Sequence, residues 1–210
     1  MDENALIRRV LEISHQHGHG HLPGTLSVLQ VLQPIMEHFD PRRDTLILSK
    51  GHGAVALYAC LETLGFKPDL NKTHPERDPA NGITCTTGSL GHGLPMAVGI
   101  ALAQMIKGAC GHIYVVMGDG ECLEGTTWEA LNLVKAWNLT TVEVHIDGNG
   151  CGALGDLPVN AASLLPILFG TTVFYHSTDK GHGVSLLHGT KDHKRVLSDA
   201  EYAQAMEELK

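Results

Sequence analysis

The sequence predicts an α/β fold in which a largely parallel sheet carries helices on both faces. Short apolar runs typical of buried strands alternate with longer segments of helical periodicity, the pattern of parallel strands joined by crossover helices. The chain has 210 residues, a length that suits one domain able to bury about 70% of its unfolded surface. We therefore expect residues 1–210 to form a single domain.

The composition indicates a globular protein and argues against several functions. Hydrophobic residues make up 43% and charged residues 18% of the chain, which is ordinary for a folded domain. A net charge of −8 argues against a broad nucleic-acid surface, and an aromatic content of 5% argues against base stacking. The 24 glycines and 14 histidines suggest backbone held close to a ligand with imidazoles nearby, or else loops with surface histidines.

The cysteines and the apolar runs predict a reduced, cytoplasmic protein. The number of cysteines is odd, no two form a CxxC pair, and their spacing fits no zinc pattern. The N-terminus lacks the apolar core of a signal peptide, and no run of 18 apolar residues occurs. The five cysteines are Cys60, Cys85, Cys110, Cys122 and Cys151.

The first half of the chain is expected to be mainly helical, with one strand. Apolar positions of helical spacing begin at Leu6 and Ile7, and Pro34 should kink or end the second helix early. We expect helices at 3–14, 27–39 and 54–64, a strand at 46–48, and loops at 18–24 and 67–87.

The second half alternates between helix and strand more regularly. Ser198 and Glu201 form a capping-box pattern that starts the last helix. Residues 154–170 form a connection to which we assign no element. We expect helices at 93–107, 126–137 and 199–209 and strands at 113–117, 142–146 and 171–175.

Two predicted strands end on residues suited to a metal–diphosphate site. Gly118-Asp119-Gly120 follows one strand, and Asp147-Gly148-Asn149 follows the next after about 30 residues. Carboxyl ends of neighbouring parallel strands meet at one edge of the sheet, where ligands bind. Carboxylate and amide oxygens suit Mg²⁺ or Ca²⁺, and glycines let the backbone approach phosphates. Simple turn chemistry is the alternative, and the paired spacing favours the metal site.

Several blocks, in order, resemble the transketolase family. The stretch from Asp119 to Asn149 resembles the thiamine-diphosphate motif, and Gly118 to Gly125 resembles GDGxxxEG. Two departures stand out: His92 replaces a family Gln, and the block at His74 lacks its leading Gly. The whole resembles the N-terminal, diphosphate-binding half of a transketolase split into two chains. Further resembling blocks are 20–27 (GHLPGTLS), 48–53 (LSKGHG), 74–76 (HPE), 86–93 (TTGSLGHG) and 180–185 (KGHGVS).

The resemblance implies a role for each matching residue. His21, His74 and His193 should face the sugar substrate, and Glu124 should link the two active sites of a dimer. Metal ligation is implied for Asp119, for Asn149 and for the backbone carbonyl of Cys151. Residues implied to bind thiamine diphosphate are His52, Gly88, Ser89, Leu90, Asp119, Gly120 and Asn149.

The resemblance also implies a partner chain. In this family a Glu on a pyrimidine-binding domain activates the cofactor, and no such domain is recognisable here. We therefore expect a partner that carries it, in a dimer of heterodimers transferring a two-carbon ketol unit from a ketose to an aldose phosphate. The segment around 155–170 resembles a shortened form of the family, by about one strand–helix unit. Ketol transfer to an unusual sugar or a carrier protein, or a non-catalytic scaffolding role, are the alternatives.

Overall fold

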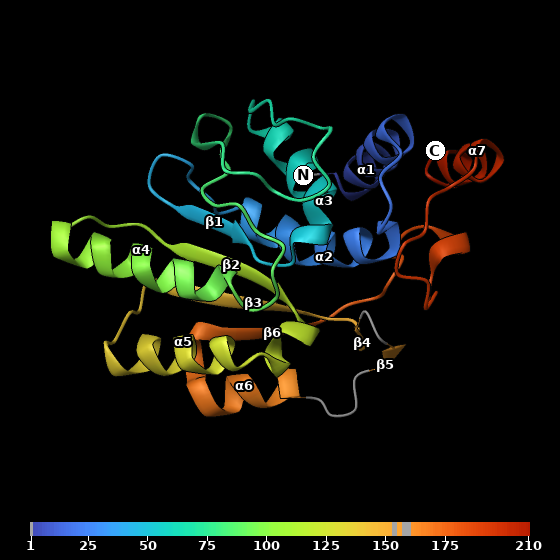
Figure 1. The fold of residues 1–210 in the computed structure, drawn as a ribbon. Helices are drawn as coiled ribbons and strands as arrows, with labels where there is room; N and C mark the ends of the chain where they lie inside the picture. The colour runs from blue at the N-terminus through green and yellow to red at the C-terminus, as the bar shows by residue number, and fades with distance from the viewer. Residues whose placement is uncertain (1, 153–154, 157–160) are drawn as a thin grey trace.

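The computed structural model describes residues 2–152, 155–156 and 161–210 (Figure 1). Its main sheet has four strands in the order β1-β2-β3-β6, and every neighbouring pair is parallel. The α/β class and the parallel sheet are thereby confirmed. The strands are β1 (Thr45–Leu48), β2 (Ile113–Gly118), β3 (Val142–Gly148) and β6 (Val173–Ser177).

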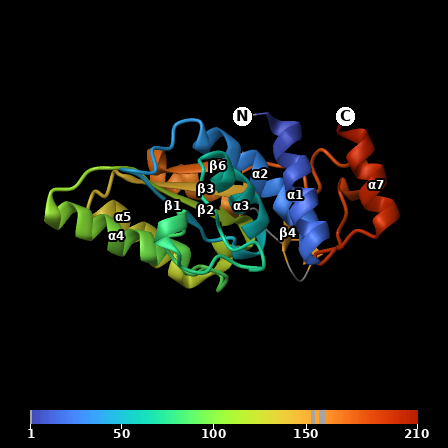
Figure 2. The ribbon, with the colours of Figure 1, turned by 90° about the horizontal axis from the view of Figure 1, so that it is seen from above.

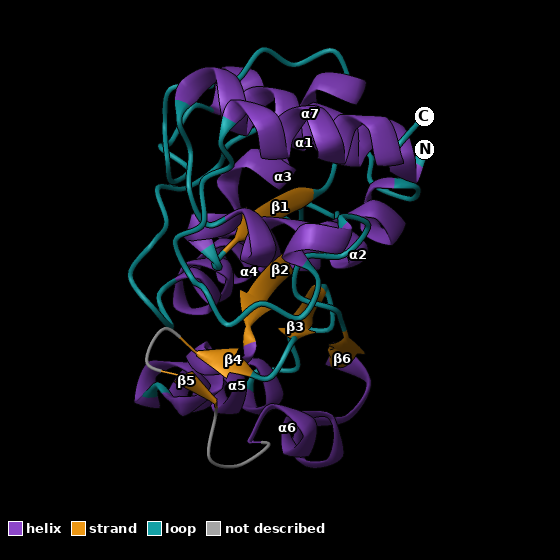
Figure 3. Cartoon of the chain, turned by 90° about the vertical axis from the view of Figure 1, so that its right-hand side faces the viewer, coloured by secondary structure: helices purple, strands orange, loops and turns teal. Residues whose placement is uncertain are grey.

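Helices cover both faces of this sheet (Figure 3). On one face lie α1 (Glu3–His17), α2 (Leu22–Met36), α3 (Ala54–Thr63) and α7 (Asp199–Glu208). On the other face lie α4 (Gly93–Lys107), α5 (Gly125–Ala136) and α6 (Ala161–Phe169). Seen from above, α7 lies beyond α1 at one end of the molecule (Figure 2). None of the described helices is long and apolar enough to cross a membrane.

Side chains that alternate along the strands belong to two separate hydrophobic cores, one on each face of the sheet. Leu46 and Leu48 of β1 pack with the α1–α3 side, whereas Ile47 packs with the α4–α6 side. Val116 and Val115 of β2 divide in the same way. This period of two follows from the pleat of a strand. Because both faces are covered, β1 and β2 are apolar throughout most of their length, whereas β3 and β6 also carry polar residues.

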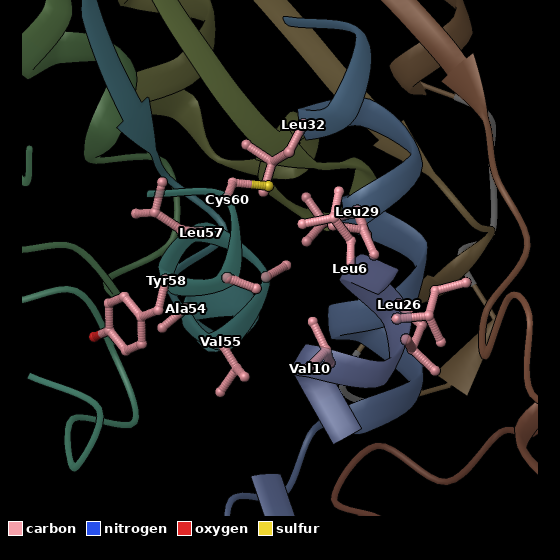
Figure 4. Packing of buried hydrophobic residues seen from close by; sticks show 14 of the residues in the cluster. Leu6, Val10, Leu26, Leu29, Leu32, Ala54, Val55, Leu57, Tyr58 and Cys60 are labelled. Carbon is pink, nitrogen blue, oxygen red and sulfur yellow. The ribbon is translucent and has the colours of Figure 1, made fainter. Parts of the chain in front are cut away.

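Helix α2 is the central element of the first core. Twelve of its 15 residues are buried, because α1 and α3 cover the side that faces away from the sheet. Figure 4 shows Leu29 of α2 beside Leu6 of α1, and Leu32 of α2 beside Cys60 of α3. The helix begins at Leu22, not at 27, so the expected loop at 18–24 is wrong for its last three residues. Pro23 falls in the first turn, where its missing N–H costs no helical bond.

The remaining differences from the expected elements are local. The exposed Pro34 is accommodated inside α2, which ends two residues later at Met36. Helix α6 occupies part of the connection to which no element was assigned, after a short antiparallel pair, β4 (Cys151–Gly152) and β5 (Gly155–Asp156). The expected shortening around 155–170 falls partly on 157–160, outside the described residues. Single turns of 3₁₀ helix lie at η1 (Gly51–Gly53), η2 (Pro79–Asn81), η3 (Asp119–Leu123), η4 (Gly170–Thr172) and η5 (Ser185–Leu187).

A smaller expectation, the capping box of the last helix, is confirmed. The Ser198 hydroxyl accepts a hydrogen bond from the Glu201 N–H, and the Glu201 carboxylate accepts from the Ser198 N–H, which completes the capping box of α7. All five cysteines are free.

The position of α2 predicts a large stability difference between two matched truncations. Leu26→Ala removes a side chain with 0% exposure from the centre of the first core, so it should lower the free energy of unfolding by about 2–5 kcal/mol. Ile106→Ala, at a position 82% exposed near the end of α4, should change it by less than about 0.5 kcal/mol. Urea denaturation of the isolated chain measures both, and equal losses would contradict the packing described.

Candidate functional site

A pocket lies at the carboxyl ends of the sheet strands. Each strand contributes polar residues just beyond its last apolar position, and the pocket lies where these segments meet, as is usual for open parallel sheets. The space between its walls, which is continuous with solvent, is about 630 Å³. The lining residues are Gly24, Ser49, Lys50, Gly51, His52, Gly88, Leu90, Gly118, Asp119, Gly120, Glu121, Asn149, Cys151, Lys180 and His193.

Asp119 and Asn149 lie together in this pocket, as the sequence predicts. Asp119 is buried at the start of η3 and accepts hydrogen bonds from the Gly120 N–H (2.9 Å) and the Gly150 N–H (2.7 Å). Burial raises the pKa of Asp119, while these two bonds and the Lys50 ammonium act in the opposite direction. The Asn149 amide oxygen accepts from the Cys151 N–H (3.1 Å). Both residues therefore retain oxygen lone pairs that a cation can use.

This donor set fits a magnesium ion shared with a diphosphate. Among the described residues, no three His, Cys, Asp or Glu side chains gather as a self-sufficient metal centre. Mg²⁺ commonly takes only one or two protein carboxylates or carbonyls and completes its shell with water and phosphate oxygens. No atom of the described residues lies within 4 Å of the place where a Cβ would stand on Gly120, so they leave the backbone there open to a ligand.

Four histidines from distant parts of the chain gather at the mouth of the pocket. The His21 ring lies 5.5 Å from His52, 6.3 Å from His74 and 5.0 Å from His193, between ring centroids. The His52 and His193 rings are 5.0 Å apart. The sequence named all four separately, and the structure brings them together.

Burial keeps these imidazoles uncharged near neutral pH. It lowers the pKa of His21 to about 4 and that of His52 to about 2, with neighbouring cations and imidazoles adding to the effect. The pKa values of His74 and His193 are lowered for the same main reason. Neutral rings can both donate and accept hydrogen bonds, which suits contact with several hydroxyl groups.

Two glycines allow the loops that carry these residues to touch. A Cβ on Gly51 would lie 2.8 Å from the Cα of Gly88, and a Cβ on Gly88 would lie 2.9 Å from the His74 ring. Gly88 also has a φ of +140°, which other residues rarely adopt. Backbone-to-backbone contact between the loops therefore sets the distance from His74 to the pocket.

Other residues that the resemblance singled out lie farther from the pocket. Glu124 is exposed at the junction of η3 and α5, and Ser89 is exposed beside Leu90. Neither is among the described pocket-lining residues. Cys151 lies at the rim, in β4.

A buried ion pair that lies beneath the pocket was not predicted from the sequence. The Lys50 ammonium donates to the Asp147 carboxylate at 2.5 Å, and the two side chains are 5% and 0% exposed. Ser27 and Thr178 also donate to this carboxylate. Lys50 stands inside a family-like block and Asp147 two residues before Asn149, but spacing alone gives no sign that they meet.

A second missed residue, Glu121, joins three of the loops. Its carboxylate accepts from the Ser49 hydroxyl, from the Gly91 N–H (3.0 Å) and from the Gly118 N–H (2.9 Å). Burial raises its pKa, and these bonds oppose that rise. Its position within Gly118-Asp119-Gly120-Glu121 was visible in the sequence, but its partners were not.

Comparison with known proteins agrees with this geometry. Residues 26–163 match the family model described as transketolase, thiamine diphosphate binding domain. The chain is 32% identical over 246 aligned residues to one subunit of the apulose-4-phosphate transketolase of Actinobacillus succinogenes, covering 91% of this chain and 88% of that protein. It is 40% identical over 147 residues to the 6-deoxy-6-sulfo-D-fructose transketolase subunit SqwG of Clostridium sp., covering 60% of this chain and 54% of the relative.

Solved structures show the same fold in a longer protein. The transketolase from Leishmania mexicana superposes with a TM-score of 0.78 at 22% identity, covering 99% of this chain but only 40% of that one. The chain thus corresponds to well under half of that transketolase. Taken with the family match and the relatives above, the fold and the site residues place this chain in the transketolase family, as a thiamine diphosphate binding domain.

Proposed function

We propose that this chain is the diphosphate- and metal-binding half of a split transketolase. It would transfer a two-carbon ketol unit from a ketose to an aldose when joined to a chain with a pyrimidine-binding domain. The observation that carries this proposal is that Asp119, Asn149, His52 and His193 line one pocket, with the His21 ring against both of these imidazoles and His74 beside it. Two relatives are named as transketolase subunits, which supports a divided enzyme.

The floor of the pocket would hold the diphosphate and its cation. Asp119 and Asn149 offer oxygen ligands, and the backbone at Gly120 lies open beside them. The Cys151 carbonyl is the third protein ligand that the family resemblance implies. His52 would contact the diphosphate as a neutral donor. When bound, thiamine diphosphate supplies the carbanion chemistry that breaks and forms the carbon–carbon bond.

The histidines at the mouth would bind the sugar. Because His21, His74 and His193 are neutral near pH 7, each can donate a proton through one ring nitrogen and accept one through the other. They can therefore orient sugar hydroxyls and exchange protons with them during the reaction. Glu124, exposed outside the pocket, stays a proposed link between active sites of a dimer of heterodimers.

The relatives' names favour the alternative in which the donor or acceptor of the ketol unit is an unusual sugar. Both name an unusual sugar, apulose 4-phosphate or 6-deoxy-6-sulfofructose, which supports a specialised ketol transfer. Transfer to a carrier protein stays an alternative without support from these names. A purely scaffolding role is disfavoured, because the oxygen ligands and the four imidazoles are all retained around one pocket.

Removing the charge of Asp119 should weaken cofactor binding. Asp119→Asn keeps the shape of the side chain but loses a charge-assisted contact of about 1.5–3 kcal/mol, so affinity should fall roughly ten- to hundredfold. Calorimetry with thiamine diphosphate and Mg²⁺ on the chain paired with its partner measures this. Asp69→Asn, in an exposed loop, is the control, and equal affinity in the two variants would contradict the assignment.

Activity should depend on a second chain. The isolated chain should show no ketol transfer, because the family's activating Glu belongs to a pyrimidine-binding domain, and addition of such a chain should restore it. The assay compares ordinary pentose phosphates with the two sugars that the relatives' names give, apulose 4-phosphate and 6-deoxy-6-sulfo-D-fructose. Turnover by the isolated chain would refute the divided active site, and no turnover of any ketose by the pair would support the scaffolding role.

The histidine cluster should make stability depend on pH. The unfolded imidazole titrates near pH 6.5, whereas the pKa of folded His21 is about 4. Between these values the unfolded state binds more protons, so stability should fall as the pH drops from about 6.5 towards 4. Urea denaturation from pH 7.5 to 4.5 should show a smaller loss in His21→Asn, since Asn tolerates the positive φ of this position. His188→Asn, at an exposed position, should keep the wild-type loss, and identical profiles for the two variants would count against the cluster.

A further inference from the structure

The Ser27 hydroxyl stands at the junction of four polar groups below the pocket. It lies 3.0 Å from the Gly24 carbonyl oxygen and 2.8 Å from Asp147 Oδ2. It also lies 3.1 Å from Lys50 Nζ and 2.9 Å from Asn149 Nδ2. Ser27 itself is completely buried on α2, so solvent does not compete for these contacts.

The number of hydrogen bonds that a hydroxyl can donate and accept determines which group is the donor in each of these contacts. A serine hydroxyl has one proton to donate and two lone pairs to accept with. Its proton is shared between the Asp147 carboxylate and the Gly24 carbonyl, neither of which can donate. The Lys50 ammonium can only donate, so it occupies one lone pair. The remaining lone pair needs a donor, and Asn149 Nδ2 supplies it.

The buried ion pair keeps this arrangement fixed. Asp147 Oδ2 accepts from both Lys50 and Ser27, and Asp147 Oδ1 accepts from Thr178, so the carboxylate is held from three sides. Reversing the Asn149 amide would place its oxygen against a hydroxyl whose single proton is already shared by Asp147 and the Gly24 carbonyl. That would leave two acceptors facing each other in a buried place, which is costly.

We infer that Ser27 is a positioning residue that, held by the Lys50–Asp147 pair, fixes the Asn149 amide with its oxygen available to a divalent cation. The amide nitrogen faces Ser27 and donates to its hydroxyl, and the amide oxygen uses one lone pair to accept from the Cys151 N–H. Its second lone pair is left for the cation. This inference rests on the proposed metal–diphosphate function, and it gives a role to a serine that this function leaves without one.

A purely structural role for Ser27 would need fewer partners. The bond from its hydroxyl to the Gly24 carbonyl, one helical turn earlier, already satisfies a buried serine. Of the other partners, Lys50 follows β1 and Asn149 follows β3, and both line the pocket, while Asp147 lies near the end of β3. Groups of this kind behind a metal ligand commonly change metal affinity about 10–100-fold when they are removed.

The first test is metal-dependent cofactor binding. Calorimetry of the chain paired with its partner, titrated with thiamine diphosphate in the presence of Mg²⁺, should show roughly tenfold weaker binding for Ser27→Ala. Ser14→Ala is the matched control: Ser14 is also buried, on α1, and its hydroxyl has no hydrogen-bond partner among the described residues. Its affinity should equal that of the wild type. Equal affinity for Ser27→Ala would overturn the inference.

The second test isolates the coupling to Asn149. In an Asn149→Ala background the amide is already gone, so Ser27→Ala should lower affinity less than twofold further. A full additional tenfold loss would show that Ser27 acts independently of Asn149 and would overturn the inference. Wild-type protein that fails to bind thiamine diphosphate at all would instead refute the proposed function, and this inference with it.

The third test needs no ligand. The side-chain amide of Asn149, identified by its disappearance in Asn149→Ala, should give an NMR signal typical of a hydrogen-bonded NH₂ group in the chain alone. In Ser27→Ala the signal should move towards that of a solvent-exposed amide, while Ser14→Ala should leave it in place. An Asn149 signal that is unchanged by Ser27→Ala would overturn the inference even if the binding affinity fell.

Discussion

The buried ion pair between Lys50 and Asp147 is the contact on which the arrangement of the site depends. It joins the loop after β1 to the end of β3, and through Ser27 and Thr178 it also holds α2 and the segment after β6. Two charges with almost no solvent exposure are stable only with complete hydrogen bonding, and losing one partner typically costs about 3–5 kcal/mol. The pair therefore ties the correct positions of four elements to one another.

A pocket built in this way needs few side chains that touch a ligand directly. Asp119 and Asn149 are the proposed oxygen ligands, while the carboxylates of Glu121 and Asp147 accept hydrogen bonds from backbone and side-chain groups behind them. These two inner carboxylates accept from N–H, O–H and ammonium donors, so they are already satisfied. The negative charge left to face a cation is that of Asp119, which suits an ion that brings phosphate oxygens with it.

The sequence predicted the strands and the residues that end them, because both are local signals. Apolar runs predicted β1, β2 and β3, and the residues after β2 and β3 pointed correctly to the pocket. The start of α2 was missed because Gly24 is typical of a loop. In the structure a Cβ there would lie 3.3 Å from the His52 ring, so tertiary packing against the pocket, and not helix propensity, accounts for that glycine.

Other features could not be predicted from the sequence, most clearly where they join residues that are far apart in the chain. Lys50 and Asp147 are 97 positions apart, and nothing in either neighbourhood indicates that they meet. Helix α6 was missed because its apolar residues are nearly continuous and include Pro166, so neither a helical period nor a helix-compatible composition was evident. The histidine cluster lies between these cases, since motif resemblance named its members but only the fold brings them together.

The way the pocket is assembled also bears on the shortening around 155–170 that the sequence predicts. The described lining residues come from α2, from the ends of β1, β2 and β3, from the 88–90 loop and from the segment after β6, and none of them comes from 155–170. In a parallel sheet each strand brings its own carboxyl-end residues to the common edge, so a strand–helix unit that contributes none can be lost without moving the others. The shortening that the sequence predicts there would then change the edge of the sheet, while the contacts among Lys50, Asp147, Ser27 and Asn149 would stay as they are.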